Sequence, residues 1–231
     1  MHKYSSSQVE SFAALGIVNT TTEPAFRCAA RMFSNSLRGK AVLDFGCGAG
    51  RSTMFVKALG ARTVIGADIN KEMIRLAKKK YNSHGLAFYN VTGRIPFRDS
   101  YFDSAFTAHM LVESRTTKEM LAVLTEIYRV LKPSSTLVIV TSNPKALGHE
   151  YKVGYTKRKK GLKSGDRVDT VINGRPSFTI KDTYWTEQDY HRAISQAGFK
   201  LVKASYPLAK GKGWLDETKV APNIVYKCMK T

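Results

Sequence analysis

A short apolar run followed by three closely spaced glycines constrains this chain more than any other feature. Residues 41–52 read AVLDFGCGAGRS. The first five of them predict a buried strand, and the glycines permit the positive φ angles of a tight turn. Ser52 is predicted to cap a helix that ends near Gly60. A glycine loop between a strand and a helix is where open α/β sheets bind nucleotides.

A carboxylate at the end of the next predicted strand supports a nucleotide-type ligand. Residues 63–68 read TVIGAD, and Asp68 follows Gly48 by twenty positions. This spacing lets a second parallel strand place an acid against a ribose, whose hydroxyls it can bind. The glycine spacing differs from the Gly-x-Gly-x-x-Gly pattern that binds a pyrophosphate. We therefore expect a nucleoside ligand without a phosphate chain.

Four segments resemble a known family. VLDFGCGAG, GADINKEMI, IPFRDSYFDSAF and EIYRVLKPSSTLVIV occur in this order within residues 40–141. They resemble the motifs of the class I S-adenosylmethionine-dependent methyltransferases, which implies S-adenosylmethionine as the cofactor. The resemblance implies an α/β fold with a Rossmann-like, doubly wound, seven-stranded sheet. The sheet is expected to be mostly parallel, with an antiparallel pair of strands at its C-terminal edge.

The remaining chain supplies strands and helices that suit this fold. Helices are expected to start at Asn70, Thr116 and Thr186, whose side chains can cap them. Apolar runs and alternation predict further strands over 86–91, 102–108, 136–140, 199–206 and 223–230.

The chain of 231 residues is predicted to form a single methyltransferase domain over 1–231. An N-terminal helical cap is expected over about 1–36, with an irregular start and a helix from about Glu23. A β-hairpin around Asn173-Gly174 is expected within an insertion over about 145–185, on the substrate side of the fold.

The resemblance also assigns cofactor contacts to individual residues. Asp44 would orient the loop or the amino group of the methionine, and Asp68 would bind the ribose hydroxyls. The family usually carries an acid where Val91 stands, so Asn90, Thr92 or backbone carbonyls would bind the adenine amino group, or packing alone would hold the ring. The other expected contacts are Gly46, Cys47 and Gly48 at the methionine end, Ile69 and Met73 at the adenine, and Thr107 near the sulfonium.

Two residues after the fourth predicted strand are candidates for chemistry. His109 and Glu113 follow the carboxyl end of 102–108, where ligands bind in such sheets. Transfer is an in-line displacement, and a base is needed only if the acceptor must lose a proton. A neutral imidazole can take that proton near pH 7, so His109 is the first candidate and Glu113 the second. The alternative is a hydrogen-bonded histidine and a solvated glutamate.

Aromatic side chains near these candidates suggest a planar acceptor. Tyr184, Trp185 and Tyr206 are expected to form a wall around it, and Tyr4 could cover the cofactor. The sequence predicts no metal site, because the three cysteines have no ligand spacing.

The net charge of +19 indicates anionic partners or simply a solvated basic surface. We expect methyl transfer to a nitrogen or oxygen of a small-molecule acceptor, with an anionic acceptor as one option. Methylation of RNA is the alternative, suggested by the basic segment 157–163, although no Asn-Pro-Pro-Tyr motif follows the fourth strand. A cofactor-binding protein without catalysis is the third hypothesis. Cysteine usage and the polar N-terminus favour a cytoplasmic protein without a membrane segment.

Overall fold

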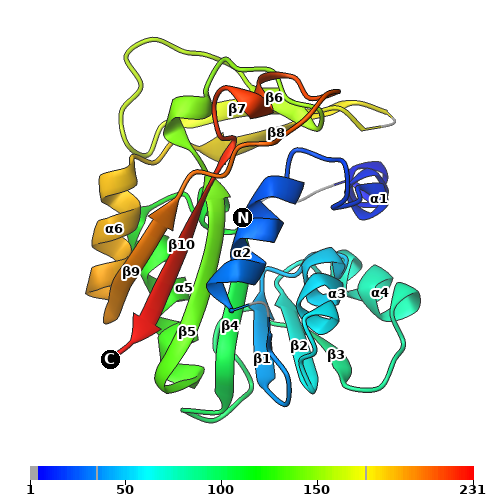
Figure 1. Ribbon diagram of the computed structural model, residues 1–231, viewed down its shortest axis with the longest axis vertical. Coiled ribbons are helices and arrows are strands. Elements are labelled where there is room, and N and C mark those ends of the chain that lie inside the picture. The colour runs from blue at the N-terminus through cyan, green and yellow to red at the C-terminus, as the bar shows by residue number, and fades with distance from the viewer. Residues whose placement is uncertain (1–4, 35, 175) are drawn as a thin grey trace.

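The centre of the molecule is a seven-stranded sheet. The computed structural model describes residues 5–34, 36–174 and 176–231. The strand order is β3-β2-β1-β4-β5-β10-β9 (Figure 1). Neighbours among β1 to β5 are parallel, whereas β10 is antiparallel to both β5 and β9, so the predicted fold class is confirmed. The strands are β1 (Ala41–Phe45), β2 (Thr63–Asp68), β3 (Leu86–Asn90), β4 (Phe102–Ala108), β5 (Leu131–Ser142), β9 (Phe199–Ser205) and β10 (Asn223–Lys230).

Helices cover both faces of this sheet because the central strands are apolar on both sides. Val42 and Val64 belong to an apolar cluster with α2 and α3, whereas Leu43 and Ile65 belong to a second cluster with α5 and α6. Only the loops at the strand ends therefore remain for a site. The helices are α2 (Glu23–Met32), α3 (Arg51–Ala58), α4 (Lys71–Lys80), α5 (Thr117–Val130) and α6 (Glu187–Gln196).

Three of the four predicted helix caps are present. Asn70, Thr116 and Thr186 each accept a hydrogen bond from a backbone amide in the first turn of α4, α5 and α6. The fourth prediction is wrong, because α3 begins one residue before Ser52. Its N-cap is Gly50 at φ +89°, a conformation that glycine adopts without strain.

The N-terminal segment contains a helix that the sequence analysis missed. Helix α1 (Ser6–Ala14) begins with a capping box in which Ser5 accepts from Gln8 N and Gln8 accepts from Ser5 N. This reciprocal pair satisfies two amides at the helix start and offsets the weak apolar periodicity of the segment. Phe12 contacts Phe178 edge to face, with ring centroids 5.0 Å apart. The helix thereby packs against the inserted region.

The insertion forms a small antiparallel sheet above the strand ends of the main sheet (Figure 1). We call it the insertion sheet; its strands are β6 (Gly154–Thr156), β7 (Arg167–Ile172) and β8 (Phe178–Thr183). Strands β7 and β8 pair as the predicted hairpin. The third strand, β6, escaped prediction because three residues are too short for a recognisable alternation.

Within the described residues, no helix is both long and apolar enough to cross a membrane. The same part of the chain contains no group of three or more side chains arranged to hold a metal ion. Cys28, Cys47 and Cys228 are all buried free thiols.

Candidate active site

The glycine loop presents bare backbone to open space. Gly48 lies between β1 and α3 at φ +52°, and no atom lies within 4 Å of the position that a Cβ would occupy there. The amides of Gly46 and Cys47 donate to Ala67 O at 2.8 and 3.1 Å, which ties the loop to the end of β2. A ligand can therefore approach the main chain at Gly48 more closely than any larger residue would allow.

Asp44 supports this loop from beneath. Its Oδ2 accepts hydrogen bonds from the hydroxyls of Ser52 and Thr53, both at 2.7 Å. Burial raises the pKa of this carboxyl to about 7, although the two hydroxyls oppose the shift. The side chain is fully buried and lines none of the cavities described below. Ser52 thus orients Asp44 instead of capping α3.

Asp68 joins the glycine loop to the end of the second strand. Its Oδ2 accepts from Gly48 N and its Oδ1 from Asn70 N, each at 2.8 Å. Burial raises the pKa of this carboxyl. Each oxygen has a second lone pair, so the carboxylate can accept further hydrogen bonds from a ligand in the cavities that it lines.

Two adjoining cavities form what we call the glycine crevice, and both are lined by Gly46, Asp68 and Ile69. The first extends along the loop and the second toward the turn after β3. Most of the predicted cofactor residues line the crevice: Gly46, Cys47, Gly48, Asp68, Ile69, Met73, Val91 and Thr92. A nucleoside fits this set, because the loop offers backbone, Asp68 offers acceptors, and Ile69 and Met73 offer apolar surface.

Besides Asp44, two predicted cofactor residues do not line the crevice. Asn90 turns its Nδ2 to Asp68 O and Ile69 O, at 3.0 and 2.7 Å. It therefore braces the turn between β2 and α4, and it lines neither cavity. Thr107 is 1 % exposed beneath the glycine loop and lines none of the three cavities either. Neither side chain lines the crevice in this structure, and their predicted contacts with the cofactor stay predictions.

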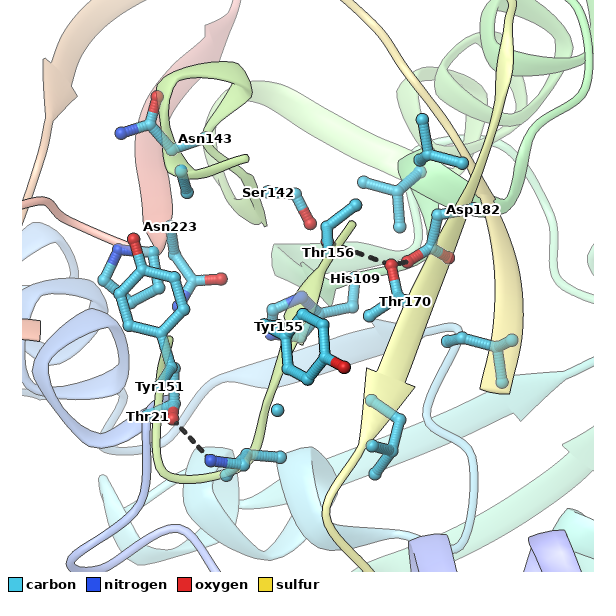
Figure 2. A pocket seen from close by; sticks show the side chains of 18 of the residues that line it. Thr21, His109, Ser142, Asn143, Tyr151, Tyr155, Thr156, Thr170, Asp182 and Asn223 are labelled. Atoms are coloured by element: carbon cyan, nitrogen blue, oxygen red, sulfur yellow. Dashed lines mark hydrogen bonds between the residues drawn. The ribbon is translucent and has the colours of Figure 1, made fainter. Parts of the chain in front are cut away.

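A third cavity lies below the insertion sheet; we call it the insert cavity (Figure 2). Tyr184 and Trp185 line it as predicted, and Trp185 Nε1 donates to Ser114 O at 3.3 Å. The predicted wall residue Tyr206 does not, because it is exposed and donates to Glu187. Tyr4 lies outside the described residues. Several lining residues were not predicted from the sequence, among them Phe12, Arg51, Tyr151, Tyr155, Thr170 and Asp182.

His109 and Glu113 stand where the glycine crevice and the insert cavity meet, since both line all three cavities. His109 follows β4 at φ +59°, and its backbone N donates to Val140 O at 2.9 Å. Its Nε2 is buried and has no hydrogen-bond partner within the described residues. Burial, aided by the positive charge of Arg51, lowers the pKa of the imidazole to about 4. The ring is therefore neutral at pH 7.

The fold and this site define a Rossmann-like protein with a nucleoside crevice next to a second cavity. Residues 43–139 match the family described as methyltransferase domain. The chain is 26 % identical to N-demethylindolmycin N-methyltransferase of Streptomyces griseus over 186 residues, which cover 78 % of each chain. It is 33 % identical to O-methyltransferase rstn1 of Aspergillus nomiae over 111 residues, which cover 46 % of this chain and about half (48 %) of that relative.

A solved structure shows the same fold. An S-adenosylmethionine-dependent methyltransferase from Mesorhizobium loti superposes with a TM-score of 0.66 at 14 % identity, over 93 % of this chain and all of that one. Residues 43–139 are therefore a methyltransferase domain, and the motifs and the glycine crevice within them are similar to those of the class I S-adenosylmethionine-dependent methyltransferases. This similarity supports S-adenosylmethionine as the cofactor.

Proposed function

We propose that the chain transfers a methyl group to a nitrogen or oxygen of a small molecule held in the insert cavity. One observation carries the proposal: the insert cavity and the glycine crevice share a wall, which is made by Phe12, Arg51, His109 and Glu113. A methyl donor bound in the glycine crevice and a methyl acceptor bound in the insert cavity would meet at that wall. The relatives named as N- and O-methyltransferases support these acceptor atoms.

The same proposal gives the residues of the glycine crevice their roles. Asp68 would bind the ribose hydroxyls, and Gly46, Cys47 and Gly48 would face the methionine part. Ile69 and Met73 would pack on the adenine, with Val91 and Thr92 at its edge. Three residues would position the loop and the turns without contacting the cofactor: Asp44, Asn90 and Thr107.

The protein's main contribution would be alignment. When bound, S-adenosylmethionine supplies a methyl group that its sulfonium already activates. The walls of the two cavities would hold the acceptor in line with that methyl, and such positioning can contribute about 7–11 kcal/mol. Nε2 of His109 is buried and has no partner within the described residues, and in the tautomer protonated at Nδ1 it would be a hydrogen-bond acceptor at the shared wall.

We infer that His109 accepts the proton that the acceptor group loses. A pKa of about 4 makes the imidazole too weak a base to deprotonate an aliphatic ammonium before transfer. It suffices for a hydroxyl, whose oxygen becomes strongly acidic as it gains the methyl. The proton would pass from that oxygen to Nε2. Glu113, on the short helix Leu111–Glu113, remains the second candidate base.

The domain organisation follows the same plan. We propose a single domain over 1–231, with the cap at about 1–36 and the insertion at about 145–185 both serving the acceptor. In support, Thr21 of the cap donates to Glu217 at 2.9 Å and accepts from Val153 N at 2.9 Å. Thr21 and Val153 both line the insert cavity.

A methyl-transfer assay tests the proposal. Purified protein with S-adenosylmethionine that carries a labelled methyl group would be incubated with a metabolite extract and, separately, with total RNA. Label in the metabolite fraction, lost in His109→Ala, would support a small-molecule enzyme with that base. Label in RNA alone would instead favour the basic segment 157–163, which is largely exposed, as a nucleic-acid contact. Cofactor binding without transfer to either would indicate a non-catalytic protein.

A further inference from the structure

The charge of the insert cavity is opposite to that of the whole molecule. The chain carries 37 lysines and arginines against 18 acids. Of the described lysines and arginines, only Arg51 lines the insert cavity, and it also lines the glycine crevice. Two acids, Glu113 and Asp182, line the same cavity. With His109 neutral, these side chains give the described wall no excess of positive charge.

Most of the remaining wall is apolar and aromatic. Phe12, Tyr151, Tyr155, Tyr184, Trp185 and Tyr190 come from the cap, the insertion and the start of α6. Rings of this kind bind a ligand chiefly through its apolar surface. The few polar groups among them then decide which functional group the ligand can carry.

A row of polar side chains crosses the insertion sheet on the face toward this cavity. Thr156 on β6 lies opposite Thr170 on β7, and Asp182 lies diagonally across on β8. Figure 2 shows Thr170 between the other two. Thr170 Oγ1 donates to Asp182 Oδ2 at 2.7 Å, and the hydroxyls of Thr156 and Thr170 are 3.0 Å apart. All three residues line the cavity, and Asp182 is only 8 % exposed.

The direction of these hydrogen bonds follows from the number of hydrogens. Thr170 has one hydroxyl hydrogen, which it gives to the carboxylate. The bond between the two threonines must therefore use the hydrogen of Thr156. The row then offers lone pairs on Thr156 and charge on Asp182, but no hydroxyl hydrogen. A ligand group placed against the row has to be a donor, and an anion would meet only acceptors.

We propose that the acceptor substrate is a largely apolar molecule that carries a hydroxyl or N–H group, and no anionic group, to donate to the row Thr156–Thr170–Asp182. This inference rests on the proposed function, because it assumes that the insert cavity holds the acceptor. It excludes the anionic acceptors that the net charge of the chain suggests. The basic surface and the acceptor cavity would then serve different ligands.

Matched probe pairs test this specificity. Each pair shares one ring system and differs in its end group: tryptophol against indole-3-acetate, and 2-phenylethanol against phenylacetate. Binding would be measured calorimetrically with S-adenosylhomocysteine at saturation and 0.5 M NaCl, which screens attraction of anions to the surface. The alcohols are expected to bind at least about tenfold more tightly than the carboxylates, since a carboxylate offers the row no hydrogen and meets the like charge of Asp182.

Variants test which residues cause the preference for alcohols over carboxylates. Asp182→Asn supplies an amide donor, and Thr170→Val releases the Thr156 hydrogen toward the cavity. Each variant is expected to reduce the ratio of alcohol affinity to carboxylate affinity to about threefold or less. The matched control is Asp169→Asn, because Asp169 pairs with Lys181 on the other face of β7 and does not line the cavity. Asp169→Asn should leave this affinity ratio as it is in the unaltered protein. Thermal melts would show which variants are folded.

Several results would overturn the proposal. These are equal or tighter binding of the carboxylates to the unaltered protein, a ratio unchanged in both cavity variants, or no binding of either pair. A separate titration with S-adenosylmethionine distinguishes the two levels of the argument. Normal cofactor binding together with one of these results would remove only the proposed specificity, whereas failure to bind the cofactor would remove the proposed function as well.

Discussion

The glycine crevice and the insert cavity lie side by side but are built in different ways. The crevice is centred on two loops at the ends of adjacent parallel strands, where Gly48 N donates to Asp68, and residues of other segments complete its walls. The insert cavity is assembled from segments as distant as Phe12, His109 and Trp185, and side chains hold it together. A site built from backbone and local spacing can be specified by a short motif. A site built from side chains depends on how the whole chain packs.

The largest expected effect tests the first half of this comparison. Asp68→Ala should remove the ribose contacts and release Gly48 N and Asn70 N. Losing two charge-assisted hydrogen bonds should weaken S-adenosylmethionine binding by about 4 kcal/mol, or about a thousandfold. Calorimetry on the variant and on Asp103→Ala, an acid that pairs with Lys132 at the start of β4 and lines none of the cavities, gives the comparison. Equal affinity of Asp68→Ala and the unaltered protein would contradict the ribose assignment.

The next effect concerns the wall shared by the two sites. The pKa of His109 is lowered to about 4, so the unfolded chain binds its proton first as the pH falls. Stability should therefore be lost between about pH 6.5 and pH 4, by about 2–3 kcal/mol for this residue. Asn tolerates the left-handed backbone at this position, so His109→Asn should lose less stability over this range. Urea unfolding at pH 4.5 and pH 7.5 measures the difference, and parallel pH profiles for the two proteins would refute a shifted histidine.

The sequence predicted the main sheet well because its signals are local. Strand β4 has the predicted bounds, 102–108, and the side chain of Asn70 caps α4 as expected. These elements follow from apolar runs, caps and turns within a few residues of each other. Helix α1 and strand β6 were missed because one is stabilised by a capping box and by packing on Phe178, and the other consists of three residues.

Position at the end of a strand was a useful but incomplete guide to the residues that line the cavities. Asp68 and His109 follow strand ends, and both reach the cavities. Asn90 and Thr107 also lie at strand ends, but Asn90 is drawn to the carbonyls of the next turn and Thr107 points beneath the loop. The polar row on the insertion sheet gave no signal in the sequence, since its three members meet only when β6, β7 and β8 pair.

A residue that belongs to both sites gives an intermediate effect. Phe12 lines the glycine crevice and the insert cavity. Phe12→Ala should open the cofactor to solvent and raise the dissociation rate of S-adenosylhomocysteine about tenfold, since buried aromatic contact of this size is worth about 1–2 kcal/mol. Phe12→Leu, which keeps apolar bulk, should change the rate about threefold or less. Stopped-flow competition measures both rates, and identical rates for alanine and leucine would show that Phe12 covers only the insert cavity.

The smallest effect tests whether the cap helix matters to the crevice at all. Ser5→Ala removes the hydroxyl that accepts from Gln8 N, so α1 should lose about 1 kcal/mol of local stability. Faster hydrogen exchange in residues 8–12 would report the fraying, and Glu10→Ala on the exposed side of the same helix is the control. If α1 holds Phe12 over the crevice, Ser5→Ala should weaken S-adenosylhomocysteine binding two- to threefold. The reason is that a less stable α1 must be ordered when the ligand binds, and part of the lost helix stability then lowers the affinity. Faster exchange with unchanged affinity would separate the cap from the crevice. The insert cavity would then be the only site that depends on the N-terminal segment, which would sharpen the contrast between a locally encoded site and one that needs the whole fold.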